Sequence, residues 1–165
     1  MGSPLVGTWR LVRVEARSRA GRSWRPAGHE AAGLLRYGRD GRMALEISAV
    51  ASPMADGPTR DERSLAPRWR LAYRGTYDSY LDPFSPDNDR VVHHVEFGSD
   101  PSWTGVDEER PIKLLGDVLT WRGSSVRTAD DWWTMHLVWE RVVSSASPVS
   151  STWSAGWFRS RSKSA

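Results

Sequence analysis

Leu5-Val6-Gly7-Thr8-Trp9 opens the first apolar run of this 165-residue chain, and Leu137-Val138-Trp139-Glu140-Arg141 closes the last one. An arginine at the end of a last strand can stack its guanidinium on the indole of a tryptophan in the first strand, and the pair then plugs one end of a closed antiparallel barrel. We therefore predict a small β-barrel in which the first and last strands meet, with Trp9 and Arg141 as structural residues at its closed end.

Alternation between apolar and polar residues, rather than helical spacing, dominates the chain up to residue 143. On the first strand it places Trp9 and Leu11 on the face opposite to Val14. Asp40-Gly41 supplies the positive φ that a tight hairpin turn needs. Eight strands are enough for a barrel interior to hold one small ligand. The pattern predicts eight strands, at residues 5–14, 33–37, 42–48, 71–78, 90–97, 109–115, 118–122 and 132–142.

The fold class that we expect is all-β, a single eight-stranded antiparallel barrel with a short helical lid insertion and a C-terminal extension. The barrel domain should span residues 1–143, with a loop at 17–32. The lid helix is expected at 59–65, where Pro67 would end it. From residue 144 the composition changes to Ser, Ala and Pro, so residues 144–165 are predicted to form a tail that is disordered, docked on protein or in contact with a membrane surface.

The composition argues against several classes of protein. Cysteine is absent, so the chain has no disulfide framework, thiolate metal site or cysteine nucleophile, which fits a reducing cytoplasm. The net charge of +3 is that of Arg159, Arg161 and Lys163 in the tail, which gives little support for nucleic-acid binding. No apolar run resembles a membrane span or a signal peptide. We expect a cytoplasmic protein in which some of the ten tryptophans line a pocket.

Strand parity indicates which polar side chains face the interior. His93 shares a face with Val91, Val95 and Phe97, so it is a better cavity candidate than His94. A neutral imidazole in a cavity can act as a general acid or base near pH 7. The alternative of equal weight is a buried histidine that is satisfied by a tyrosine or a backbone carbonyl.

Two further side-chain types are candidates for chemistry. Tyr73 and Tyr77 share a face on either side of Gly75, where a ligand or another backbone could approach closely. Their hydroxyls either point at one bound molecule or belong to ordinary half-buried strand aromatics. Arg110 shares a face with Ile112 and needs a partner there, because burying a lone cation is costly. That partner is either a carboxylate or enolate of a ligand, or an internal acidic side chain.

Other side chains are expected to contact a ligand without taking part in chemistry: Tyr37, Phe97, Trp103 and Trp121. Metal binding has little support, since His94 and Glu96 share a face without a third ligand at usable spacing. The sequence has no glycine-rich nucleotide motif, phosphate loop or Gly-x-Ser-x-Gly elbow. We therefore expect no metal and no cofactor.

A series of motifs, in order over roughly residues 5–143, resembles the lipocalin-like domain family of bacteria and fungi. The resemblance implies a small antiparallel barrel of a kind associated with natural-product pathways, where such proteins bind or cyclise reactive intermediates. The motifs are Leu5-Val6-Gly7-Thr8-Trp9-Arg10-Leu11, Gly33-x-x-x-Tyr37 with Asp40-Gly41-Arg42-Met43, Tyr73-x-Gly75-Thr76-Tyr77, His93-His94-Val95-Glu96, Trp103-x-Gly105 and Leu137-Val138-Trp139-Glu140-Arg141.

The leading hypothesis is a cofactor-independent cyclase or isomerase that holds one conformer of a hydrophobic, polyketide-like or terpenoid intermediate. His93, Tyr73, Tyr77 and Arg110 would donate or remove a proton. The alternative is a non-catalytic carrier of a small hydrophobic molecule, and a third hypothesis is an interaction module that works through residues 144–165. The expected partner is a hydrophobic small molecule rather than a nucleic acid, and a homodimer is compatible with the sequence.

Overall fold

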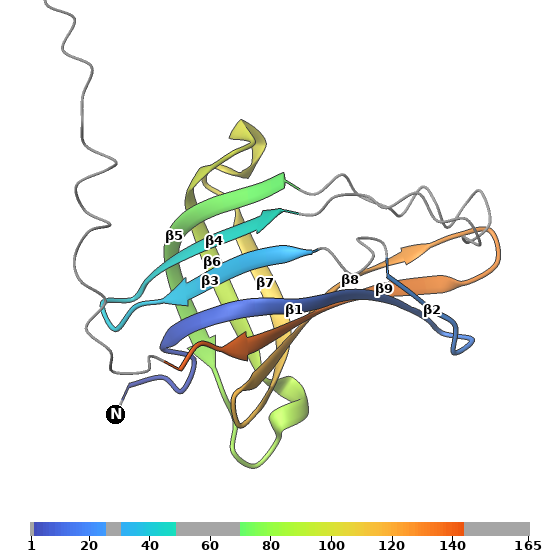
Figure 1. Cartoon of the computed structure of the whole chain (residues 1–165), viewed down its shortest axis with the longest axis horizontal. Coiled ribbons are helices and arrows are strands. Elements are labelled where there is room, and N and C mark those ends of the chain that lie inside the picture. Colours follow the sequence, from blue (N-terminus) through green and yellow to red (C-terminus); the bar gives the residue numbers. More distant parts are fainter. Residues whose placement is uncertain (1, 26–30, 49–69, 144–165) are drawn as a thin grey trace, which may run out of the picture.

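The computed structural model describes residues 2–25, 31–48 and 70–143. In this part of the chain, nine strands form one antiparallel sheet in the order β2-β1-β3-β4-β5-β6-β7-β8-β9, and a further pairing of β1 with β9 closes it (Figure 1). Eight strands form the barrel, and β2 is an extra strand paired with β1. The strands are β1 (Gly7–Ser18), β2 (Ser23–Trp24), β3 (Ala32–Tyr37), β4 (Arg42–Ser48), β5 (Arg70–Tyr80), β6 (Arg90–Gly98), β7 (Asp107–Leu115), β8 (Val118–Arg127) and β9 (Trp132–Arg141).

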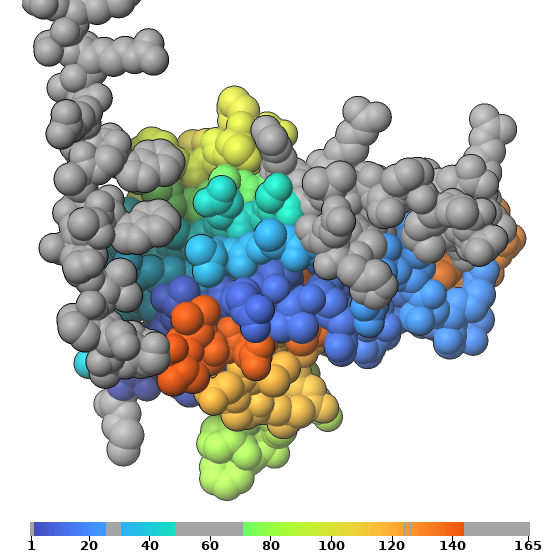
Figure 2. All heavy atoms as spheres, viewed as in Figure 1, coloured from blue at the N-terminus to red at the C-terminus, as the bar shows by residue number. Residues whose placement is uncertain are grey.

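Strand β1 is the seam of the barrel. It lies between β3 and β9, as both the ribbon and the space-filling view show (Figure 1, Figure 2). Its pairing with β9 runs from Trp9 opposite Arg141 to Ser18 opposite Trp133. A β-bulge between Leu11 and Arg13 interrupts this register. Each barrel strand therefore has a neighbour on both sides, which is how a closed sheet removes its free edges.

The prediction of an eight-stranded barrel is confirmed, but two details of β1 were predicted wrongly. Val14 is buried and not on the face opposite Leu11, because the bulge inserts one extra residue and moves the following side chains to the other face. Part of the expected loop at 17–32 is also extended. Pairing with β9 carries β1 on to Ser18, and Ser23–Trp24 adds β2.

The predicted lid helix at 59–65 and the predicted tail at 144–165 lie outside the described residues. Within them, the helical elements are two single 3₁₀ turns, η1 (Pro86–Asn88) and η2 (Pro101–Trp103). Neither is long and apolar enough to cross a membrane as a helix.

The main core lies inside the barrel, and its largest fully buried side chains include Trp9, Trp139 and Tyr37. Ala16, Trp24 and Trp133 form a second small cluster where β1 and β9 extend beyond the main core. The barrel interior is thus built from aromatic and aliphatic side chains, and the fully buried His93 is a polar group among them.

Arg141 plugs one end of the barrel, as the sequence predicts. Its guanidinium carbon lies 4.2 Å from the centre of the Trp9 ring, and its nitrogens donate to the carbonyls of Val6 at 2.8 Å and Pro4 at 2.7 Å. Nε donates to Asp117 at 3.0 Å. These contacts connect Arg141, the last residue of β9, to the N-terminal segment, to β1 and to Asp117, which directly precedes β8.

Gly7 is expected to be essential for this plug, because its φ is +145° and a Cβ there would lie 2.7 Å from Nη1 of Arg141. We expect Gly7→Ala to lower the free energy of unfolding by about 1–3 kcal/mol, from backbone strain and the displaced guanidinium. Urea unfolding followed by tryptophan fluorescence measures this. Gly2→Ala is the matched control, since a Cβ at Gly2 meets nothing within 4 Å. Equal unfolding midpoints for the two variants would contradict the role of Gly7.

Candidate functional site

The imidazole of His93 is held between two tyrosine hydroxyls inside the barrel. Nε2 lies 2.7 Å from the hydroxyl of Tyr37 on β3, and Nδ1 lies 2.6 Å from the hydroxyl of Tyr73 on β5. All three side chains are buried. Alternation along each strand points them inward, and the order β3-β4-β5-β6 curves the sheet so that they meet. We call these three residues the Tyr-His-Tyr cluster.

The interior holds His93 in its neutral form. Burial, together with the positive charge of Arg110 and the proximity of His94, lowers the pKa of His93 to about 3. Burial likewise raises the pKa of Tyr37 and of Tyr73 well above the usual value for a tyrosine, although Arg110 partly offsets the rise for both. At pH 7 the cluster is therefore an uncharged hydrogen-bonded unit, and its imidazole does not change charge near that pH.

The cluster has one proton more than its own hydrogen bonds use. Two tyrosine hydroxyls and one neutral imidazole carry three polar protons, and the two hydrogen bonds with His93 take up two of them. Whichever ring nitrogen carries the proton, one hydroxyl is left to donate elsewhere. Among the described residues, neither Tyr37 nor Tyr73 has a second acceptor for its hydroxyl. The cluster is thus a hydrogen-bond donor toward the interior.

Arg110 on β7 adds a cation next to the cluster. Nη2 lies 3.0 Å from Oε2 of Glu108, and both side chains are largely buried, with 17% and 25% of their surfaces exposed. The internal acid that the sequence analysis offered as one partner of Arg110 is therefore Glu108. Nε of Arg110 is buried and has no acceptor in the described part of the chain.

Two tryptophans pack against the cluster. The Trp103 ring stacks on Tyr73 at 5.7 Å with an interplanar angle of 16°, and the edge of Trp121 meets His93 at 5.1 Å. Nε1 of Trp121 is buried and has no acceptor at good hydrogen-bond geometry within residues 2–25, 31–48 and 70–143, although its N–H lies toward the Tyr37 hydroxyl and partly offsets the raised pKa of Tyr37. The spare hydroxyl, Arg110 and Trp121 therefore all offer N–H or O–H donors, which suit a ligand with an acceptor oxygen.

Two of the predicted site residues do not join this cluster. The hydroxyl of Tyr77 donates to the carbonyl of Gly38 at 2.9 Å, in the β3-β4 turn, although its ring packs on Tyr37 at 4.5 Å. Phe97 was predicted to share a face with His93, and this is wrong. A bulge between β5 and β6 shifts the register beside it, so that the ring is 59% exposed on the outer wall, under the guanidinium of Arg74.

Sequence reasoning also missed one residue and left one question open. Glu108 was missed because the strand was predicted to begin at Glu109, whereas β7 begins at Asp107. The signal that could have identified Glu108 is its alternation with Arg110 along the strand. The open question concerned what approaches Gly75. The answer is a backbone, since a Cβ at Gly75 would collide with the carbonyl oxygen of His94.

His94 lies on the outer wall, as predicted, between two carboxylates. Nδ1 is 2.7 Å from Asp107 and Nε2 is 2.9 Å from Asp78, and these hydrogen bonds raise the pKa of His94. Within the described residues no group of three or more His, Cys, Asp or Glu side chains could hold a metal ion.

Comparison with known proteins shows what this chain is similar to. A family model described as a lipocalin-like domain matches residues 6–142, a range that contains every residue of the Tyr-His-Tyr cluster. A 4'-hydroxy-3'-methoxypropiophenone carrier protein from Aspergillus oryzae is 33% identical over 84 residues, which are 47% of this chain and 75% of that protein.

The low pKa of His93 predicts a loss of stability in mild acid. In the unfolded chain His93 binds a proton as the pH falls below 6.5, whereas in the folded protein it stays neutral down to about pH 3, so acid favours unfolding across that window. We expect this residue to remove about 2 kcal/mol of stability between about pH 7 and about pH 5. Urea unfolding at both pH values compares the wild type with His93→Gln.

His93→Gln should lack this pH-dependent loss, because an amide can still bond to both tyrosines but does not titrate. His94→Gln is the matched control. The raised pKa of His94 makes its own contribution fade as the pH rises, which is the opposite sign. An unchanged acid sensitivity in His93→Gln would show that this imidazole is not held neutral.

Proposed function

Because the chain belongs to the lipocalin-like domain family, we propose that its barrel binds a small hydrophobic molecule with an acceptor oxygen and carries it as an intermediate of a biosynthetic pathway. The observation that supports this most is the Tyr-His-Tyr cluster, a neutral and buried unit with one hydroxyl proton to spare. The aromatic walls around it suit an apolar ligand, and the spare donor suits a carbonyl or phenol oxygen.

The relative from Aspergillus oryzae supports the same proposal. The compound in its name, 4'-hydroxy-3'-methoxypropiophenone, is an aromatic ketone and combines a planar ring with a carbonyl oxygen. In this chain, Trp103 and Trp121 would contact the ring of such a molecule, and the cluster would donate to its carbonyl. A ligand of this class needs neither a metal nor a cofactor to bind.

A carrier requires binding without turnover, and the state of His93 favours that role. Both ring nitrogens are engaged with tyrosine hydroxyls, and the imidazole is neutral over the physiological range. A general base near pH 7 would need a free nitrogen and a pKa closer to the working pH. The cluster is better suited to hold an acceptor in place than to shuttle a proton.

We expect 4'-hydroxy-3'-methoxypropiophenone to quench the tryptophan fluorescence of the protein with 1:1 saturation. The double variant Tyr37→Phe with Tyr73→Phe should bind it about 3- to 10-fold more weakly, the loss expected for one hydrogen bond. Tyr80→Phe is the matched control, because Tyr80 is 47% exposed on the outer wall. Thermal unfolding of each variant establishes that it is folded.

A matched ligand sharpens this test. The analogue in which the carbonyl is replaced by a methylene should bind more weakly to the wild type and equally to the wild type and the double variant. Absence of saturable binding by either compound would contradict the carrier proposal for aromatic ligands. Equal affinity of the wild type for both compounds would contradict a hydrogen bond donated to the carbonyl oxygen.

The second candidate function is the cyclase or isomerase, and the observation that favours it is the Arg110–Glu108 pair beside Tyr73. In such a reaction Glu108 would remove a proton from the carbon next to a carbonyl. Donors from Arg110 and Tyr73 would stabilise the enolate oxygen, and the proton would return at the same or another carbon. This chemistry needs no cofactor.

Deuterium uptake separates the two functions. With the ketone bound in D₂O, a carrier leaves the exchange of the hydrogens next to the carbonyl at the buffer rate, and this is the result that we expect by mass spectrometry. Exchange that is accelerated by the protein and lost in Glu108→Gln would overturn the carrier proposal in favour of catalysis.

A further inference from the structure

A basic groove crosses the outer wall of the barrel, away from the Tyr-His-Tyr cluster. It is a hollow of about 500 Å³ where β1, β9 and β8 lie side by side. Its side chains alternate with inward-facing ones: Thr134 flanks the buried Trp133, and Arg17 flanks the buried Ala16. We call it the Arg122 groove, and the residues used below are Arg17, Arg19, Arg122, Ser125, Trp132 and Thr134.

The register brings these side chains together in two rows across the three strands. Arg17 is opposite Thr134, and Thr134 is opposite Ser125. In the next row His136 lies between Glu15 and Arg122. Cations and hydroxyls from three strands therefore line one hollow, and the rigid sheet fixes their spacing.

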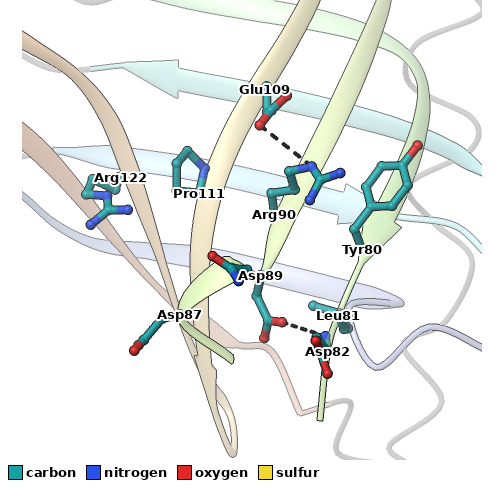
Figure 3. Close-up of a pocket in the computed structure, with 10 residues that line it drawn as sticks. Tyr80, Leu81, Asp82, Asp87, Asp89, Arg90, Glu109, Pro111 and Arg122 are labelled. Carbon is teal, nitrogen blue, oxygen red and sulfur yellow. Dashed lines mark hydrogen bonds and ion pairs between the residues drawn. The ribbon is translucent and has the colours of Figure 1, made fainter. Parts of the chain in front are cut away.

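The side chains that line the groove include three arginines and no carboxylate. Glu15 is the acid of these rows, and it already pairs with Arg17 at 3.1 Å and with Arg13 at 3.5 Å. Arg19 and Arg122 have no ion-pair partner among the described residues. Figure 3 draws Arg122 with other residues that line an adjoining hollow of about 640 Å³, where Asp87 and Asp89 also lie and Arg90 pairs with Glu109.

The pKa of His136 responds to the positive charge of the neighbouring arginines. Its pKa is lowered by partial burial and by the charges of Arg17 and Arg122, although Glu15 acts in the opposite direction. The hydroxyls add donors suited to an oxyanion. Those of Ser125 and Thr134 share one hydrogen bond of 2.7 Å, which leaves one of their two protons to donate outward.

An exposed indole completes the groove. Trp132 is 43% exposed, and the guanidinium of Arg127 lies 5.9 Å from its ring centre. An indole beside guanidinium groups offers a stacking surface for a planar ring, while arginines bind phosphate oxygens through paired N–H donors. A hollow of this size accommodates a small molecule rather than a single ion.

We propose that the Arg122 groove binds a phosphorylated small molecule with a planar ring, of the nucleoside diphosphate class, with the phosphates on Arg19 and Arg122 and the ring on Trp132. This site is separate from the barrel interior. A test of this site therefore does not depend on whether the barrel interior acts as a carrier.

Calorimetric titration of the full chain at low ionic strength tests the proposal, with ADP and inorganic pyrophosphate as probes. Both should bind saturably, and Arg122→Gln and Arg19→Gln should each weaken pyrophosphate about tenfold or more, as expected for a lost charge-assisted hydrogen bond. Trp132→Ala should weaken ADP and leave pyrophosphate unchanged. The matched control is Arg42→Gln, which removes a cation paired with Glu96 elsewhere on the wall.

Three results would overturn the proposal. If Arg42→Gln weakened pyrophosphate binding as much as Arg122→Gln does, the binding would reflect the net charge of the protein and not a specific site. Undiminished ADP binding by Trp132→Ala would remove the planar ring from the assignment. A salt-sensitive dimer in sedimentation that Arg122→Gln abolishes, without binding of either probe, would assign the groove to a second copy of the chain, whose acidic side chains would pair with it.

Discussion

The pairing of β1 with β9 is the constraint on which the remaining structure depends. It closes the sheet, so that the inward-facing side chains of eight strands meet in a common interior instead of on one face of an open sheet. Arg141 sits at the end of this pairing and ties it to Trp9 and to the N-terminal carbonyls. Without closure, neither the burial of His93 nor its two tyrosine partners would follow.

Closure then determines the chemistry of the interior. The side chains of the cluster are buried, and a buried polar group needs a hydrogen-bond partner to offset the cost of its burial. His93 finds both of its partners in Tyr37 and Tyr73, and burial keeps it neutral. What remains is an excess of donors, from one hydroxyl, Arg110 and Trp121. This excess is the physical basis for proposing a ligand that contributes an acceptor oxygen.

The eight barrel strands and most central residues could be predicted from the sequence, because strand alternation is a local property, whereas β2 and the extension of β1 to Ser18 could not. Parity placed His93 in the interior and Tyr73 on one face with Tyr77, whereas Trp103 and Trp121 were expected only as ligand contacts, and Trp103 lies in the 3₁₀ turn η2 rather than on a strand. Parity failed wherever pairing between strands overrides the alternation. The bulges misplaced Val14 and Phe97, a boundary error of two residues hid Glu108, and the partner of the Tyr77 hydroxyl depends on how a turn folds against β5. Of these features, only the alternation of Glu108 with Arg110 can be recognised within a single strand.

The fold is that of the lipocalin-like family, and we propose that its buried Tyr-His-Tyr cluster binds a ligand rather than transfers a proton. The measurement that tests this most directly is a crystal structure of the full chain with 4'-hydroxy-3'-methoxypropiophenone. The account predicts the ketone inside the barrel, with its carbonyl oxygen about 2.7 Å from the hydroxyl of Tyr37 or Tyr73. A ketone bound on the outer wall, or inside with its carbonyl turned away from both hydroxyls, would contradict it.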